Sequence, residues 1–145
     1  MLQRISTLIK VGLVWCFPCL LSAQIGETRE QLKARYGPAL SVGGQDVFES
    51  APFHITVFYD ELGRSRLMIY ALASKARKAI TNNVEAYMKK IMTDLSNGLD
   101  WNLVEKKVSE ATYLRSDKKL FARVNYEENL IFFMTPDAMR AYERR

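Results

Sequence analysis

A β-hairpin expected over residues 53–72 constrains the fold of this chain more than any other segment. In its first strand, apolar side chains alternate with His54, Thr56 and Phe58. This period of two places the two sets on opposite sides of a sheet. Residues 60–63 supply the turn, because aspartate bonds to its local backbone and glycine adopts the positive φ of a four-residue or bulged hairpin. The return strand covers residues 65–72.

One face of this hairpin is expected to be dry. Pairing of Ile55 and Val57 with Leu67 and Ile69 would place four branched or long apolar side chains on one side. A two-stranded hairpin alone is marginally stable in water. The rest of the chain must therefore supply further strands or a helix that docks on this face.

The other face of the hairpin is more apolar than a solvated sheet face requires. Such a surface is either covered by a second layer or exposed as a partner site, and residues 82–95 offer a helix that could cover it. We take the second reading as the functional hypothesis. The candidate partner-binding face consists of Phe58, Met68, Tyr70 and Trp101.

The first 23 residues have the three-part pattern of a signal peptide. Arg4 and Lys10 precede the apolar run 11–21, and small residues then lead to polar composition at Gln24. We predict cleavage between Ala23 and Gln24. The run is about half the roughly 20 residues that a spanning helix needs, so a retained anchor is the less favoured alternative. The expected product is a periplasmic or secreted protein that meets the membrane only through this leader.

Cleavage would leave 122 of the 145 residues, the size of a single domain covering residues 24–145. Both cysteines, Cys16 and Cys19, lie in the leader. The predicted mature chain therefore has neither a disulfide nor a thiolate metal ligand. Its 19 basic and 16 acidic residues give a net charge of +3. This mild charge and the exported location argue against nucleic acid as a partner.

Capping and stop signals predict three helices. Thr28 and Gln31 have the spacing of a capping box, and Gly37 with Pro38 ends that helix. A second helix is expected over residues 82–95, and a closing helix begins after Thr135 and runs to about residue 144. The apolar stripe of the second helix is Val84, Tyr87, Met88, Ile91, Met92 and Leu95, and Met139 and Tyr142 point inward from the closing helix.

Further strands are expected over residues 46–50, 111–115, 120–125 and 129–134. Residues 41–44 are expected to form a loop, and Trp101 is expected in a loop or at the start of a strand. The last strand is apolar throughout, which is typical of a central strand. The fold class is thus α+β, with antiparallel sheet built from two helix-plus-three-strand units and a C-terminal helix. Residues 26–72 and 80–134 form a possible pseudo-repeat, and residues 73–78 a linker.

The segment from Gly26 to Pro38, followed by a hairpin with glycine at its turn, resembles the opening of small exported bacterial proteins of the BamE/SmpA type. The β-lactamase inhibitor protein fold is similar to the same theme. Gly26, Thr28, Leu32, Tyr36 and Gly37 fit the family motif over residues 26–70, whereas Pro38 follows the glycine directly and the lipidated cysteine is missing. The resemblance implies an envelope or secreted scaffold that works by protein contact.

Catalytic and metal-binding signals are weak. His54 is the only histidine and has no evident nucleophile, so we predict no catalytic, cofactor or metal site. The leading hypothesis is a non-enzymatic module that binds another envelope or secreted protein. One alternative is a small hydrolase that acts on envelope polymers through a carboxylate pair. Another is an inhibitor of an extracytoplasmic enzyme, with residues 48–50 as the inserting loop.

Overall fold

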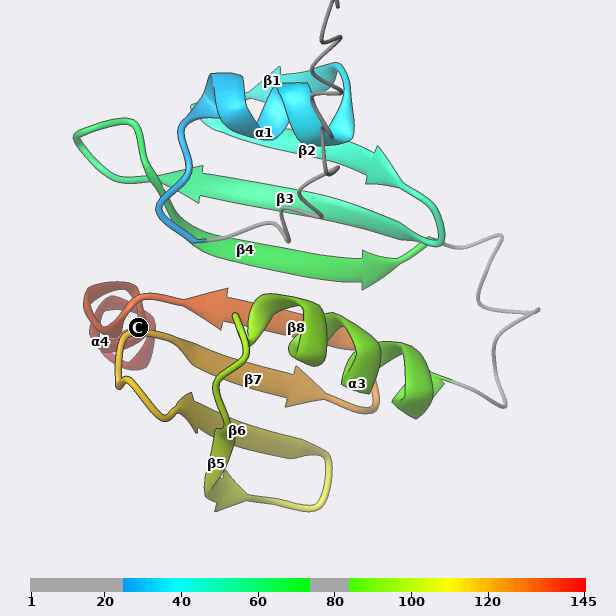
Figure 1. Ribbon diagram of the computed structural model, residues 1–145, viewed down its shortest axis with the longest axis vertical. Coiled ribbons are helices and arrows are strands. Elements are labelled where there is room, and N and C mark those ends of the chain that lie inside the picture. The colour runs from blue at the N-terminus through cyan, green and yellow to red at the C-terminus, as the bar shows by residue number, and fades with distance from the viewer. Residues whose placement is uncertain (1–24, 74–83) are drawn as a thin grey trace, which may run out of the picture.

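The computed structural model describes residues 25–73 and 84–145, so the expected leader, nearly all of the expected linker and the start of the second helix lie outside the described residues. The described chain has a mixed α/β fold with three helices and an open, antiparallel, eight-stranded sheet in the order β1-β2-β3-β4-β8-β7-β6-β5 (Figure 1). The strands are β1 (Ala39–Val42), β2 (Gln45–Ser50), β3 (Phe53–Tyr59), β4 (Ser65–Leu72), β5 (Trp101–Lys106), β6 (Glu110–Arg115), β7 (Phe121–Asn125) and β8 (Leu130–Met134).

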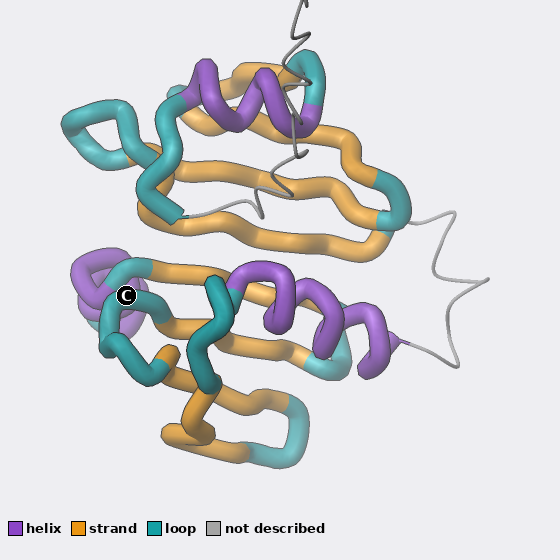
Figure 2. The backbone as a smooth tube through the Cα atoms, in the orientation of Figure 1, coloured by secondary structure: helices purple, strands orange, loops and turns teal. Residues whose placement is uncertain are grey.

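The helices α1 (Arg29–Tyr36) and α3 (Val84–Leu95) cover the same face of the sheet, α1 over β1 and β2 and α3 over β8 and β7 (Figures 1 and 2). Leu32 from α1 and Met88 and Leu95 from α3 join one buried cluster with the strand residues Phe48, Phe53, Ile55, Val57, Met68, Tyr70, Ile131 and Phe133. This face therefore holds the main core. The third helix, α4 (Pro136–Glu143), packs through Met139 on the opposite face of the sheet.

The helix signals in the sequence are confirmed where they can be compared. Thr28 and Gln31 form the expected capping box, and Gly37 follows α1 with a φ of 87°. Thr135 caps α4 by accepting a hydrogen bond from the backbone N–H of Ala138. Leu130–Met134 is central in the sheet, as its apolar composition predicts, because β8 pairs with both β4 and β7. Tyr142 turns its ring toward Phe132 of β8, with the ring centroids 5.9 Å apart, but it stays 42% exposed at the margin of this contact.

The predicted pairing of the hairpin is wrong by one residue. Val57 lies opposite Met68 and Ile55 opposite Tyr70, so the buried face carries Met68 and Tyr70. The reason is a β-bulge: Tyr59 pairs with Ser65, but Phe58 pairs with Leu67, which leaves Arg66 as an extra residue. One extra residue reverses the alternation of every following side chain. Leu67 and Ile69 therefore lie on the face opposite the main core.

Each half of the chain has one strand more than the sequence predicted. The expected loop 41–44 is a tight hairpin between β1 and β2, because Gly43 and Gly44 both adopt positive φ, 58° and 83°. Two consecutive residues with positive φ form the kind of two-residue turn whose twist matches the right-handed twist of the flanking strands. Trp101 opens the edge strand β5, which pairs with β6. In chain order, α1 is thus followed by the four strands β1–β4 and α3 by the four strands β5–β8.

Candidate functional site

The sheet has an apolar surface on the side away from α1. We define the open face as Thr56 and the apolar side chains of β1–β4 that point to this side and lie beyond α4: Leu40, Val42, Val47, Thr56, Phe58, Ile69 and Ala71. Three polar side chains point to the same side and flank the open face, because Gln45 is paired with Val42, and Glu49 and His54 are paired in one row with Ala71. Leu40 lies opposite Val47, Val47 opposite Thr56, and Thr56 opposite Ile69, which forms a continuous row across four strands. Antiparallel sheets that face water on one side usually carry polar residues there.

Within the described residues, only α4 lies over this side of the sheet, and it packs at one end. Met139 of α4 groups with Met134, and Leu67, Phe121 and Phe132 pack against this pair. The open face begins next to this cluster, since Ile69 is paired with Phe132. Leu40 is 68% exposed and Val42 54% exposed, whereas the other members of the open face are half-buried by one another. The open face ends at β1, an edge strand.

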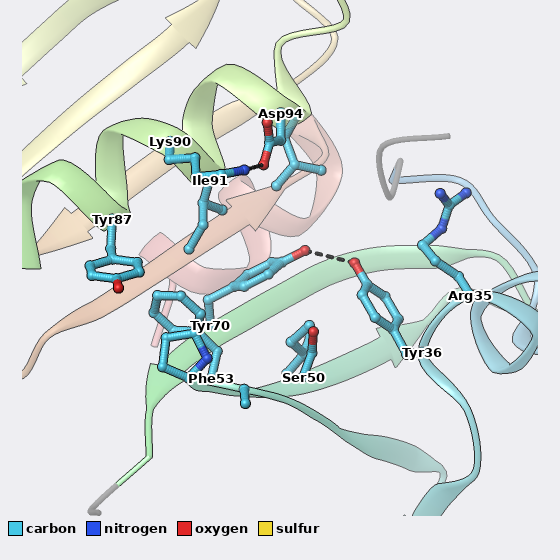
Figure 3. A pocket seen from close by; sticks show the side chains of 13 residues that line it. Arg35, Tyr36, Ser50, Phe53, Tyr70, Tyr87, Lys90, Ile91 and Asp94 are labelled. Carbon is cyan, nitrogen blue, oxygen red and sulfur yellow. Dashed lines mark hydrogen bonds and ion pairs between the residues drawn. The ribbon is translucent and has the colours of Figure 1, made fainter. Parts of the chain in front are cut away.

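A cleft of about 640 Å³ lies on the other side of the sheet, between α1 and α3. Its floor is formed by β2, β3 and β4, and Figure 3 shows Tyr36 on one wall and Tyr87 and Ile91 on the other. Phe53 contacts both Tyr70 and Tyr87 edge-on, with ring centroids 6.1 and 6.4 Å apart. The cleft is therefore lined mainly by aromatic and aliphatic groups.

Two tyrosine hydroxyls meet in this cleft. The Oη atoms of Tyr36 and Tyr70 are 3.0 Å apart and form a hydrogen bond (Figure 3). Burial raises the pKa of Tyr36, and burial together with the neighbouring Tyr36 raises the pKa of Tyr70 well above its ordinary value. Both phenols therefore stay protonated at neutral pH, and neither can act as a base there.

The charged groups at the rim of the cleft are paired. Arg35 of α1 donates to the carboxylate of Glu27, and Lys90 donates to Asp94 one helical turn later at 2.7 Å. Asp94 is the only carboxylate among the described residues that line the cleft. A carboxylate pair of the kind a glycosidase uses is therefore not assembled in the described part of this cleft.

A buried ionic cluster fixes the start of α1 to the sheet. The side chain of Asp46 is fully buried and accepts hydrogen bonds from Ser41 Oγ at 2.5 Å and Tyr59 Oη at 2.8 Å. It also forms an ion pair with Arg29, whose Nε lies 2.7 Å from the carboxylate. Burial by itself would raise the pKa of Asp46, but the two hydroxyls and the guanidinium outweigh it and lower the pKa. Burial and the hydrogen bond to Asp46 raise the pKa of Tyr59 to about 12. Because the Asp46 carboxylate already accepts from two hydroxyls and is paired with a guanidinium, this cluster acts in stability.

The four residues of the predicted partner-binding face do not share one exposed surface. Met68 is fully buried and Tyr70 is 6% exposed, both in the main core. Trp101 packs against the same core, donates its indole N–H to the carbonyl of Met92 and lies 6.0 Å from the ring of Phe133. Phe58 alone belongs to the open face. The bulge at Arg66 explains the separation, since without it Met68 and Tyr70 would share the side of Phe58.

The other residues that the sequence analysis weighed for function, His54 and residues 48–50, lie within strands of the sheet. His54 lies half-buried on β3, opposite Ala71. Residues 48–50 belong to β2, and Phe48 is fully buried, so the expectation of an inserting loop there was wrong. The alternation of β2 turns Phe48 toward the core. No group of three metal-ligating side chains occurs among residues 25–73 and 84–145, and no helix in those ranges is long and apolar enough to cross a membrane.

Comparison of the sequence with protein-family models finds no match, and neither does comparison with curated proteins. Comparison with solved structures finds matches at low TM-score and low identity. A DUF4309 family protein (YjgB) from Bacillus subtilis matches with a TM-score of 0.42 and 9% identity, over 75% of this chain and 78% of that chain. An extracellular protein containing a SCP domain from Bacillus anthracis matches with a TM-score of 0.37 and 12% identity, over 94% of this chain and 52% of that chain. The resemblance to the BamE/SmpA type stays a prediction.

Proposed function

We propose that this protein is an exported, non-enzymatic module that binds another envelope or secreted protein through the open face. The observation that carries the proposal is the apolar row Leu40, Val47, Thr56 and Ile69, which crosses four strands without a helix over it in the described structure. Burial of such a row by a partner would remove apolar area from water, which is the main driving force of protein association.

Two further features support a protein as the partner. The open face is one side of four neighbouring strands of a sheet, whereas a small molecule is usually held in a concave site. It also runs to the free edge of β1, where a partner strand can add its own backbone hydrogen bonds to the sheet.

Site-specific photo-crosslinking in the native host tests the proposal. A benzophenone side chain at Ile69 reports on the open face, and the same side chain at Val104 of β5, which is 57% exposed, is the control. We expect a discrete protein adduct from Ile69 and none from Val104. Thr56→Lys should abolish the adduct, because it places a charge in the middle of the apolar row, whereas Asn102→Lys on exposed β5 should not.

The proposal fails if both crosslinker positions give the same adducts, or if Thr56→Lys leaves the adduct from Ile69 unchanged while the protein remains folded. Circular dichroism of each purified variant establishes that it is folded. The partner is then identified by mass spectrometry of the adduct, and its contact with the open face is checked by binding of the two purified proteins.

A further inference from the structure

The cleft between α1 and α3 differs from the open face in shape and chemistry and lies on the other side of the sheet. Its volume of about 640 Å³ falls within the range of roughly 300 to 1,000 Å³ that is typical of small-molecule sites. An inference about the cleft therefore stands independently of the proposed function.

The walls of the cleft indicate what kind of surface a ligand would present. Tyr87 is 37% exposed on α3 and Tyr36 is half-buried on α1, so each offers part of a ring to the space between the helices. Ile91 adds an aliphatic contact next to Tyr87. Aromatic rings favour offset or edge-on contact with other rings and with apolar groups. A ligand that fits must be mostly apolar, and a planar ring would find an aromatic partner on the wall formed by Tyr87.

The polar groups indicate the charge of the ligand and its hydrogen bonding. Arg35 is paired with Glu27, and Lys90 is paired with Asp94. These two pairs cancel in charge, so the lining does not favour a charged ligand. In the Tyr36–Tyr70 pair, one hydroxyl donates to the other, and the second hydroxyl keeps its proton for a further acceptor. This spare O–H is persistent, because both phenols remain protonated at neutral pH.

We infer that the cleft is a binding site for an uncharged, mostly apolar small molecule that contains an aromatic ring and one hydrogen-bond acceptor. The ring packs against Tyr87 and Ile91, and the acceptor receives the spare hydroxyl proton of the Tyr36–Tyr70 pair. Both contacts exist before binding, because the helices that hold these residues are packed on the sheet. Preorganised contacts of this kind reduce the entropic cost of binding.

A pair of fluorescent probes tests this inference on the full-length protein. Prodan is an uncharged naphthalene with one ketone, and its propyl analogue has a methylene in place of the ketone. Tyr87→Ala removes one wall and should weaken both probes about threefold to tenfold. The matched control is Tyr142→Ala, since Tyr142 is also on a helix, is 42% exposed and lies 5.9 Å from the ring of Phe132. It should change neither affinity.

The double variant Tyr36→Phe with Tyr70→Phe tests the hydrogen bond. It removes both hydroxyls together and leaves no unpaired buried group, so the fold should be preserved. We expect prodan to bind about threefold to tenfold more weakly, while the affinity of the propyl analogue stays the same. Absence of saturable binding, equal effects of Tyr87→Ala and Tyr142→Ala, or an equal response of the two probes to the double variant would overturn the inference.

Discussion

Replacement of Asp46 by asparagine should destabilise this protein strongly, although it changes few atoms. The carboxylate is fully buried, accepts hydrogen bonds from Ser41 and Tyr59, and forms an ion pair with Arg29. Asparagine keeps one acceptor oxygen but turns an NH2 group toward donors. Removal of one partner from a buried ion pair costs about 3 to 5 kcal/mol. Because Arg29 is 39% exposed and can be solvated, we expect a loss of about 2 to 3 kcal/mol.

The assay is urea unfolding followed by circular dichroism at neutral pH, with Asp137→Asn as the control. Asp137 is also paired with an arginine, Arg140, but its side chain is 82% exposed, so its loss should change the free energy of unfolding by less than about 0.5 kcal/mol. The slope of the unfolding free energy against urea should be unchanged in both variants. Equal losses from Asp46→Asn and Asp137→Asn would refute the reasoning about burial.

The same carboxylate predicts a dependence of stability on pH. Its pKa is lowered in the folded protein, so the unfolded chain binds its proton more tightly than the folded chain does. The stabilisation by Asp46 is therefore complete above the unfolded pKa, about 3.9, and is lost as the pH falls through the lower folded pKa. Asp46→Asn should reduce the acid-induced loss of stability relative to wild type, measured by urea unfolding between neutral and acidic pH.

Two further substitutions test local features of the fold by the same urea assay. Gly44→Val should lower the free energy of unfolding by about 1 to 2 kcal/mol, because valine at a φ of 83° strains the backbone. The loss should be smaller for Gly44→Asn, because asparagine tolerates positive φ. Equal losses from the two variants would contradict this account. Thr135→Ala should lower the free energy of unfolding by about 1 kcal/mol, because it removes the N-cap of α4. Thr135→Ser keeps the hydroxyl and should largely preserve the free energy of unfolding. An unchanged free energy of unfolding in Thr135→Ala would show that the cap contributes little.

Local signals in the sequence predicted helix ends well, because their physics lies within a few residues. The capping box of Thr28 and Gln31 and the proline after Thr135 are complete in four residues or fewer. The hairpin register failed because a single bulge residue, Arg66, reverses the faces of β4 and leaves no mark in its composition. The glycine pair 43–44 was the available signal for β1, since two glycines between short polar and apolar runs favour a tight hairpin.

The two candidate surfaces were beyond sequence reasoning for a different reason. The cleft combines Tyr36 of α1, Phe53 of β3, Tyr70 of β4 and Tyr87 of α3, which are up to 51 positions apart in the chain. Only the order of the strands brings them together. Tyr87 in particular falls on the apolar stripe of its helix, yet it is partly exposed because that helix stands beside a gap and not beside another helix.

The pairing of β4 with β8 has a consequence for how the protein is made. Among the described strands, this is the only pairing that joins one of β1–β4 to one of β5–β8. It requires residues 67–71 to pair with residues 130–134. While a ribosome extends the second half, the emerging first half therefore shows a bare β4 edge to its surroundings. The β4 edge could then pair with a strand of another chain before β8 of the same chain reaches it. The yield of correctly folded protein should therefore fall as the concentration of nascent chains rises.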